Sequence, residues 1–218
     1  MRSSLLLLAF GLAACEPSSS PEALPVFTGG DAFMDDGVDN PGFAVFRDTL
    51  RSIVARQDTL AFLSLVADDA KLSYDEAPGG PEGLRALWLA DDASPPEPLW
   101  TVFDRLLSAG SVEEDGAFTI PFVAGLWPES LDPFAHVAAV GDSTIARRQP
   151  DGREVARLSG VLILPLSDLT DADVWNIVLP DGSEAYIPRT HAVSPVGYRA
   201  TFWQEEDDWK LQVFVDGD

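Results

Sequence analysis

The stretch VWNIVLPDGSEAYIP, residues 174–188, alternates apolar and polar side chains, breaks at Pro-Asp-Gly (180–182), and then alternates again. Alternation with a period of two predicts strands that each bury one face. Proline presets φ, aspartate favours turns and glycine can adopt positive φ, so the break predicts a tight turn. The stretch therefore predicts a β-hairpin in which Trp175, Ile177 and Leu179 share one face of the first strand.

The residues around this hairpin continue the same pattern of short strands and turns. Upstream, STIARRQPDGREVARLSG (143–160) predicts two strands joined by a polar loop. A strand with a tryptophan, an Asp-Gly turn and a return strand that carries Tyr186 together resemble a bacterial SH3-like (SH3b) domain. The resemblance covers residues 134–194 and implies a small all-β barrel.

Membership of the SH3b family would imply ligand binding. Such domains often bind cell-wall peptidoglycan or dock on a protein partner in the cell envelope. The resemblance makes Trp175 and Tyr186 the candidate ligand-binding residues of this domain. The alternative is that both side chains fill a small core, because aromatic residues dominate burial in small domains.

The region before this domain mixes helical and strand patterns. Asn40-Pro41 predicts the start of one helix, and apolar residues on one face from Leu99 to a capping Gly110 predict another. FRDTLRSIVARQDTLAFLSLVADDAKLSYD (46–75) resembles the opening of NTF2-like α+β domains. ATFWQEEDDWKLQVFV (200–215) resembles the hairpin that closes them.

These patterns predict the α+β fold class and a division of the chain into parts. A mixed helix-and-strand domain is expected over 41–130, an SH3-like barrel over 133–194, and a terminal β-hairpin over 196–218. Two arrangements fit the sequence. Either the hairpin packs back on the N-terminal domain, with the barrel inserted, or the domains are consecutive and the hairpin extends the second.

The beginning of the chain, MRSSLLLLAFGLAAC, indicates export. Its apolar run, 5–12, is too short for a spanning helix, which takes about 20 residues. A charged start, an apolar middle and small residues describe a signal peptide over 1–14. The LAAC ending resembles the bacterial lipoprotein signal, which implies lipidation of Cys15. The alternative is an ordinary cleaved signal with an incidental cysteine.

The residues after Cys15 predict a lipid-anchored, flexible linker over 15–40, because they are rich in proline, serine, glycine and acids without any period. Partial docking is expected within residues 26–40. The membrane is then a partner through the lipid anchor. Glu16, in place of aspartate, favours the outer membrane of a bacterium, at its periplasmic face or the cell surface.

The charge balance excludes one class of partner. The chain has 36 acidic and 14 basic side chains, a net charge of −22. Nucleic-acid binding needs basic residues that neutralise phosphates, so no nucleic-acid partner is expected.

The sequence contains no catalytic motif, no metal-ligand spacing and no cofactor site that can be recognised, and it leaves open a pair of catalytic carboxylates that would meet only in the fold. Its only cysteine is assigned to the anchor, its two histidines (His136 and His191) are far apart, and no GxSxG motif occurs. Of the six tryptophans, Trp100 departs from the apolar face of its predicted helix and is a further candidate contact residue.

The sequence therefore predicts a non-enzymatic envelope lipoprotein that binds peptidoglycan or an envelope protein. The alternative function is binding or turnover of a small molecule in an NTF2-like pocket of the N-terminal domain.

Overall fold

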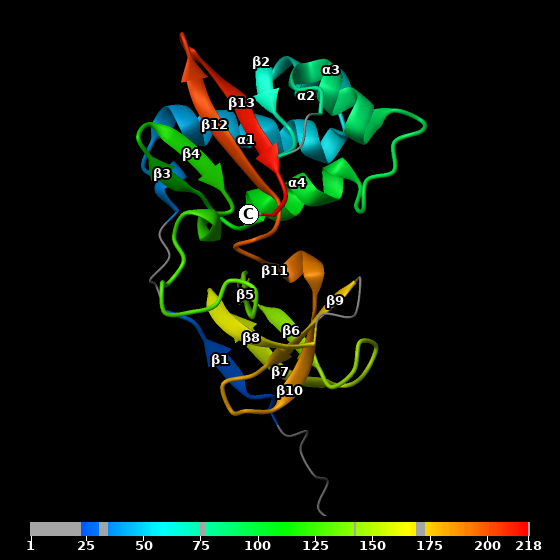
Figure 1. The fold of residues 1–218 in the computed structure, drawn as a ribbon. Helices are drawn as coiled ribbons and strands as arrows, with labels where there is room; N and C mark the ends of the chain where they lie inside the picture. The colour runs from blue at the N-terminus through cyan, green and yellow to red at the C-terminus, as the bar shows by residue number, and fades with distance from the viewer. Residues whose placement is uncertain (1–22, 31–34, 75–76, 142, 169–172, 218) are drawn as a thin grey trace, which may run out of the picture.

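The structure, a computed structural model, consists of two lobes that are each built around a β-sheet (Figure 1). It describes residues 23–30, 35–74, 77–141, 143–168 and 173–217. The first lobe combines helices with a five-stranded sheet, and the second contains an eight-stranded sheet. The α+β fold class predicted from the sequence is confirmed.

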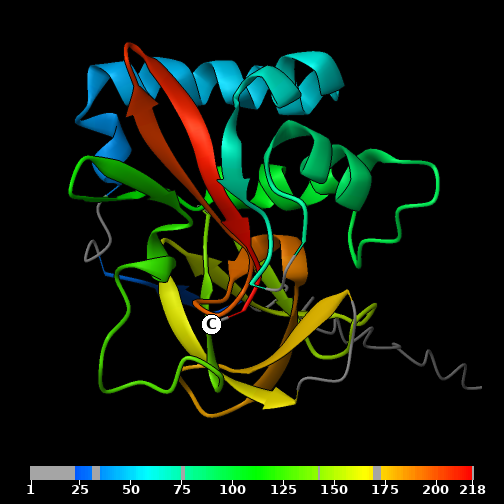
Figure 2. The same ribbon diagram turned by 45° about the horizontal axis from the view of Figure 1, so that its top comes forward.

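The sheet of the first lobe has the strand order β2-β13-β12-β4-β3. Its strands are β2 (Val66–Lys71), β3 (Val112–Glu114), β4 (Ala117–Ile120), β12 (Arg199–Glu205) and β13 (Asp208–Val215). Helices cover one face of this sheet, as Figures 1 and 2 show. They are α1 (Pro41–Arg56), α2 (Thr59–Ser64), α3 (Gly80–Leu84), which continues as a π-helical turn (Arg85–Leu89), and α4 (Leu99–Ser108).

The helices begin and end where local chemistry predicts. The Asn40 side chain accepts a hydrogen bond from the Phe43 amide at 3.0 Å, and Pro41 is the first residue of α1. Asp58 caps α2 in the same way, through the Ala61 amide at 3.1 Å. These side chains satisfy amides that have no partner within the helix. Gly110 follows α4 with a φ of +68°, a conformation that favours glycine.

Aromatic rings fill the layer between helices and sheet. Phe43 stacks on Phe118 with ring centroids 4.0 Å apart, and Phe103 contacts Phe214 at 4.8 Å. The buried phenylalanines of this core, each at most 2% exposed, are Phe43, Phe62, Phe103, Phe118, Phe202 and Phe214. Since each aromatic side chain buries about 150–250 Å², these rings make the main apolar contribution to this lobe.

The sheet of the second lobe has the strand order β1-β7-β6-β10-β9-β8-β5-β11. All neighbours are antiparallel except β1 and β7, which are parallel. The strands are β1 (Val26–Thr28), β5 (His136–Ala139), β6 (Thr144–Arg147), β7 (Glu154–Ser159), β8 (Leu162–Asp168), β9 (Val174–Val178), β10 (Glu184–Pro188) and β11 (Ala192–Val193). β1 and β11 are the two edges, so the pairing of the described strands does not close the barrel expected from the sequence.

The stretch 174–188 forms the predicted hairpin, β9 and β10. Ile177 lies opposite Ala185, and Asn176 lies opposite Tyr186. The turn is closed by a hydrogen bond from the Gly182 amide to the Leu179 carbonyl oxygen at 2.8 Å. Gly182 has a φ of +84°, which explains the glycine at this place.

The terminal hairpin packs back on the first lobe. β12 pairs with β4, and β13 pairs in parallel with β2, so β12 and β13 lie at the centre of the first sheet. The strands from β5 to β11 lie between β4 and β12 in the chain. Of the two arrangements that the sequence allowed, the structure has the inserted one.

In the described part of the predicted linker (15–40), residues 26–28 and Asp35 dock on the rest of the protein, and partial docking was expected for residues 26–40. Residues 26–28 form β1, which pairs with β7, and the Gly29 amide donates to the Ser159 carbonyl oxygen at 2.8 Å. A Cβ atom on Gly29 would lie 1.8 Å from the Val161 carbonyl oxygen, so only glycine allows this approach. Residues 15–22 and 31–34 lie outside the described part of the chain.

The same segment also binds the first lobe, through Asp35. Its carboxylate accepts hydrogen bonds from Arg47 at 2.6 Å and from the Ser111 hydroxyl at 2.8 Å. Arg47 is 4% exposed and so requires a counter-ion. Burial on its own raises the pKa of Asp35, but the hydrogen bonds from Arg47 and Ser111 outweigh this and hold it below its usual 3.8. Residues 23–40 therefore contact both lobes.

Replacing Asp35 with alanine should lower the free energy of unfolding by about 2–3 kcal/mol at pH 7, because it leaves Arg47 buried without its partner. Since the pKa of Asp35 is lowered by folding, its contribution is complete above pH 3.8 and is lost as the pH falls below that value. Urea unfolding at pH 7 and at pH 3 measures both effects.

The matched control is Asp48→Ala, which removes an exposed ion pair with Arg51. That variant should change the free energy of unfolding by no more than about 0.5 kcal/mol. Equal losses in the two variants would contradict a specific role of Asp35.

Candidate functional site

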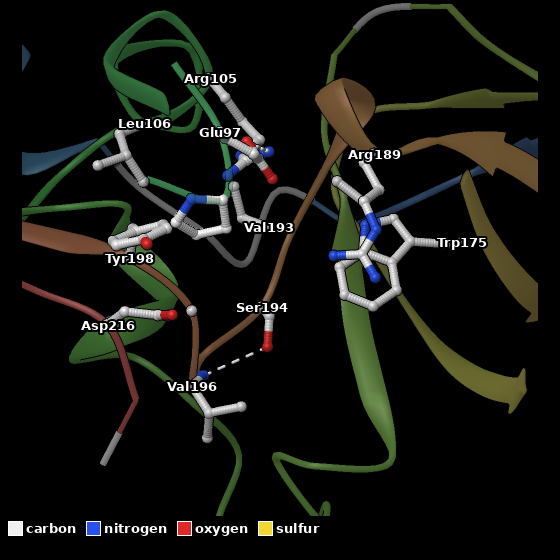
Figure 3. A pocket seen from close by; sticks show the side chains of 13 residues that line it. Glu97, Arg105, Leu106, Trp175, Arg189, Val193, Ser194, Val196, Tyr198 and Asp216 are labelled. Atoms are coloured by element: carbon white, nitrogen blue, oxygen red, sulfur yellow. Dashed lines mark hydrogen bonds and ion pairs between the residues drawn. The ribbon is translucent and has the colours of Figure 1, made fainter. Parts of the chain in front are cut away.

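A cleft between the two lobes is the strongest candidate site (Figure 3). It contains a cavity of about 290 Å³. The first lobe contributes α4, the loop before it and the ends of the terminal hairpin. The second lobe contributes β9, the turn after β10, and β11. Because these segments are far apart in the sequence, the cavity forms only when both lobes are folded together.

Trp175 and Arg189 form the wall that belongs to the second lobe. The Arg189 guanidinium lies over the Trp175 ring, 4.0 Å from its centroid. The Arg189 amide donates to the Asp173 carbonyl oxygen at 3.0 Å, which fixes the turn that carries this side chain. The indole Nε1 of Trp175 is buried and has no hydrogen-bond acceptor among the described residues. A buried donor without a hydrogen-bond acceptor lowers the stability of the fold unless a ligand or a water molecule accepts its hydrogen bond.

Tyr198 and Asp216 form the opposite wall, on the side of the first lobe, with Glu97 and Arg105 beside them. Figure 3 shows the two walls facing each other across the cavity. Glu97 accepts a hydrogen bond from Arg105 at 2.8 Å, and these two side chains are 28% and 12% exposed. Tyr198 precedes β12 and Asp216 follows β13, so both lie at the end of the hairpin that faces the second lobe.

The environment keeps the Tyr198 hydroxyl neutral. Burial raises the pKa of Tyr198 to about 12, and the negative charges of Asp216 and Glu97 add to this effect. At neutral pH the phenol is therefore protonated. It can donate one hydrogen bond and accept others.

Asp216 is a carboxylate whose charge is not fully compensated. Burial is the largest cause that raises the pKa of Asp216 above its usual 3.8, and the charge of Glu97 raises it further. The Gly217 amide and the positive charges of Arg105 and Arg199 oppose this shift without cancelling it. A cation placed near Asp216 would relieve the unfavourable charge.

A second cavity adjoins the first. It measures about 630 Å³ and shares Pro96, Tyr198 and Asp216 with the smaller one. It extends along the first lobe toward Trp88 and Tyr74, and Trp88 packs edge-on against Tyr198 with ring centroids 5.3 Å apart. Trp88 belongs to the π-helical turn after α3, a distortion often found at functional sites. Together the cavities form one groove with Asp216 near its middle.

The structure places Trp175 in this groove but not Tyr186. Trp175 lies opposite Ile187, which is fully buried, so the two share the face of the sheet that packs on the core. Tyr186 is the neighbour of Ile187 in the strand and therefore points to the other face. The two candidate ligand-binding residues of this domain thus lie on opposite sides of the hairpin.

The other predicted site residues are also separate from the groove. Trp100 lies on α4 and packs edge-on against Phe62, with ring centroids 5.4 Å apart, so it is half-buried rather than an exposed contact. Its environment includes Gln57 and Asp104, not the groove. Cys15 lies outside the described residues.

Sequence analysis missed Glu97, Arg105, Arg189, Tyr198 and Asp216. Four of them had no recognisable signal, because each lies in a different segment and only the tertiary fold brings them together. Arg189 had a weak one: it is a cation that directly follows the return strand of the tryptophan hairpin.

Comparison with protein-family models, with curated proteins and with solved structures found no match. In the part of the chain that the structure describes, no helix is both long and apolar enough to cross a membrane. Within the same residues, no three His, Cys, Asp or Glu side chains come together to hold a metal ion.

Replacing Asp216 with asparagine should raise the midpoint of thermal unfolding at pH 7 by no more than about 1 °C, because solvent reaches this side chain and screens its charge. Because folding raises the pKa of Asp216, the folded protein loses stability as this group ionises above pH 3.8. Asparagine carries no charge, so the difference between the two proteins should vanish below that pH.

Calorimetry at pH 7 and pH 3 measures this difference. The matched control is Asp207→Asn in the exposed turn between β12 and β13, which should leave the midpoint unchanged at both pH values. A lower midpoint for Asp216→Asn at pH 7 would show that the carboxylate stabilises the fold instead.

Proposed function

We propose that this protein is a non-enzymatic lipoprotein of the bacterial cell envelope that binds peptidoglycan in the groove between its lobes. The observation that carries the proposal is the wall formed by Trp175 and Arg189. It combines an aromatic ring, the guanidinium that lies over this ring and a buried indole N–H that has no acceptor in the described part of the chain. Such a combination of apolar surface with a few placed polar groups is typical of ligand sites.

The order of strands in the second lobe supports an SH3-like assignment. β8, β9 and β10 form a meander, and one 3-10 turn (Arg189–His191) then leads to β11, which returns to pair with β5. The strands β6 and β7 with the polar loop between them lie between β5 and β8 in the chain, where the resemblance to SH3b domains placed two strands joined by a polar loop. In this proposal the groove uses the second lobe as its binding module and the first as its opposite wall.

Export and lipid anchoring through Cys15 are part of the same proposal. Residues 16–25 separate Cys15 from β1, and β1 pairs with β7 of the second lobe. The chain that follows the anchor therefore first joins the sheet of the second lobe.

Cys15→Ala should abolish incorporation of labelled palmitate and move the protein from the membrane fraction to the soluble fraction, because stable anchoring depends on acyl chains. A variant that still labels and sediments with membranes would exclude Cys15 as the anchor.

Peptidoglycan binding is tested by co-sedimentation of residues 16–218 with purified sacculi at low and high salt. All described contacts lie within residues 23–217. We expect binding at both salt concentrations, since a ring and hydrogen bonds are screened less than surface charges. Trp175→Ala should weaken binding at least about tenfold, the effect of losing a central aromatic contact.

The matched control is Trp203→Ala, which removes a tryptophan that is 42% exposed on β12, away from the groove. It should bind sacculi like the unaltered protein. Circular dichroism of both variants separates loss of binding from loss of fold. Folded protein that stays in the supernatant at both salt concentrations would overturn the proposal.

A second candidate function is binding of a small molecule in the first-lobe end of the groove. The cavity of about 630 Å³ favours it, because ligand pockets usually measure about 300–1,000 Å³. An enclosed pocket between the helices and the sheet, as the likeness to NTF2-like domains implied, has less support, because stacked rings such as Phe43 and Phe118 occupy that layer. Failure of sacculus binding would leave this candidate.

A further inference from the structure

Aromatic side chains that carry a polar group gather in the groove between the lobes. The chain has six tryptophans and three tyrosines. Four of these residues, Tyr74, Trp88, Trp175 and Tyr198, line the two adjoining cavities. Such rings combine a large apolar surface with a hydrogen-bonding group, so the groove suits a ligand that has both apolar and polar surface.

The arginines that line the groove already have partners. Arg105 pairs with Glu97 at 2.8 Å. The Arg189 guanidinium lies over the Trp175 ring, 4.0 Å from its centroid, and this residue has further interactions. Neither arginine is therefore free to bind an anionic group of a ligand.

Two other cations lie beside the larger cavity, and both contact Tyr74. Arg199 donates hydrogen bonds to the Tyr74 hydroxyl and to the Gly217 carbonyl oxygen. The Lys71 ammonium lies over the Tyr74 ring, 4.5 Å from its centroid. Neither side chain lines the cavity itself. These cations therefore hold Tyr74 in place at one end of the groove.

Asp216 has hydrogen-bonding capacity that the described part of the chain does not use. Its side chain is exposed to solvent and lines both cavities. None of the ion pairs within 4.0 Å among the described residues includes it. The Gly217 amide donates one hydrogen bond to this carboxylate, which can accept about four. Hydroxyl groups of a ligand are suitable donors for the remaining positions.

Tyr198 adds a group that both donates and accepts hydrogen bonds. Figure 3 shows it beside Asp216 on the wall of the first lobe. Its phenol is protonated at neutral pH, so it can donate one hydrogen bond and accept others. A ligand with neighbouring hydroxyl groups can therefore bind the carboxylate with one of them and the phenol with the next.

We propose that the groove binds a neutral oligosaccharide, with sugar hydroxyl groups against Asp216 and Tyr198 and the apolar C–H groups of the sugar against the aromatic side chains. This inference rests on the proposed function, since it assigns the groove to the glycan chain of peptidoglycan rather than to its peptides. The adjoining cavities of about 290 and 630 Å³ together leave room for more than one sugar ring.

The charge of the whole protein favours a neutral ligand over the peptides. With a net charge of −22, the field around the molecule repels groups such as a free peptide carboxylate. A neutral sugar chain approaches without this repulsion. Pro96, Leu106 and Val193 add apolar surface between the walls, which suits the methyl group of an N-acetylated sugar.

The test is calorimetric titration of residues 16–218 at pH 7 with two probes, tri-N-acetylchitotriose and tri-alanine. The first is a neutral chain of three N-acetylated sugars, and the second is a peptide with charged ends. We expect the trisaccharide to bind at least about tenfold more tightly than tri-alanine. Because the trisaccharide has no charge, its affinity should change by less than about twofold between low and high salt.

Two variants assign the binding to the wall of the first lobe. Asp216→Ala should weaken trisaccharide binding at least about tenfold, because it removes hydrogen bonds to a charged group. Tyr198→Phe, which removes only the hydroxyl, should weaken it about threefold to tenfold. The matched controls are Asp207→Ala in the exposed turn between β12 and β13, and Tyr186→Phe on the second lobe away from the groove. Both controls should bind like the unaltered protein, and circular dichroism verifies the fold of every variant.

Several results would overturn the inference: no binding of the trisaccharide, equal affinity for tri-alanine, or trisaccharide binding that is unchanged in both Asp216→Ala and Tyr198→Phe. Sacculus binding that depends on Trp175, combined with any of these results, would leave the proposed function standing without the glycan assignment. The expected trisaccharide binding without sacculus binding would support the sugar site and overturn peptidoglycan as its source.

Discussion

The fold depends on one long-range pairing, the return of β13 to the centre of the first sheet. The Leu211 amide donates to the Leu65 carbonyl oxygen at 2.7 Å, and β13 then separates β2 from β12 along the sheet. Phe214 on this strand contacts Phe103 of α4, so the last strand also completes the core under the helices. Without it, β2 would have no neighbour in the sheet and the inserted second lobe would have no fixed place.

The same pairing builds the groove. Because the hairpin enters and leaves the first sheet at the junction of the lobes (Figure 1), the residues at its two ends, Tyr198 and Asp216, must face the second lobe. The N-terminal segment adds a second constraint, since β1 extends the sheet of one lobe while Asp35 binds Arg47 in the other. The entropic cost of closing a loop rises only slowly with its length. Contacts between segments far apart in the sequence can therefore still fix how the two lobes are arranged.

The sequence predicted what local chemistry determines. The cap at Asn40, the apolar face of α4 and the turn at Gly182 all depend on neighbouring residues, and all three are found. The pairing of β1 with β7 was not predictable, because a three-residue strand has no measurable period and its partner lies about 130 residues away. Trp175 and Tyr186 were both candidates for ligand binding, but strand alternation puts residues opposite and next to Ile187 on different faces. The groove residues had no shared pattern, because only the fold makes them neighbours.

The placement of cations in so acidic a chain is itself informative. The chain has only 14 basic side chains against 36 acidic ones. Two arginines, Arg105 and Arg189, line the same cavity, so cations are more frequent there than on the average surface. Arg105 pairs with Glu97 on one wall, and the Arg189 guanidinium lies over the Trp175 ring on the other. Salt screens the interaction between exposed charges that are more than about 8–10 Å apart. It screens much less the interaction between charged groups in a partly desolvated cleft. The charged groups of the cleft therefore still act on one another at ionic strengths that screen the field of the whole protein.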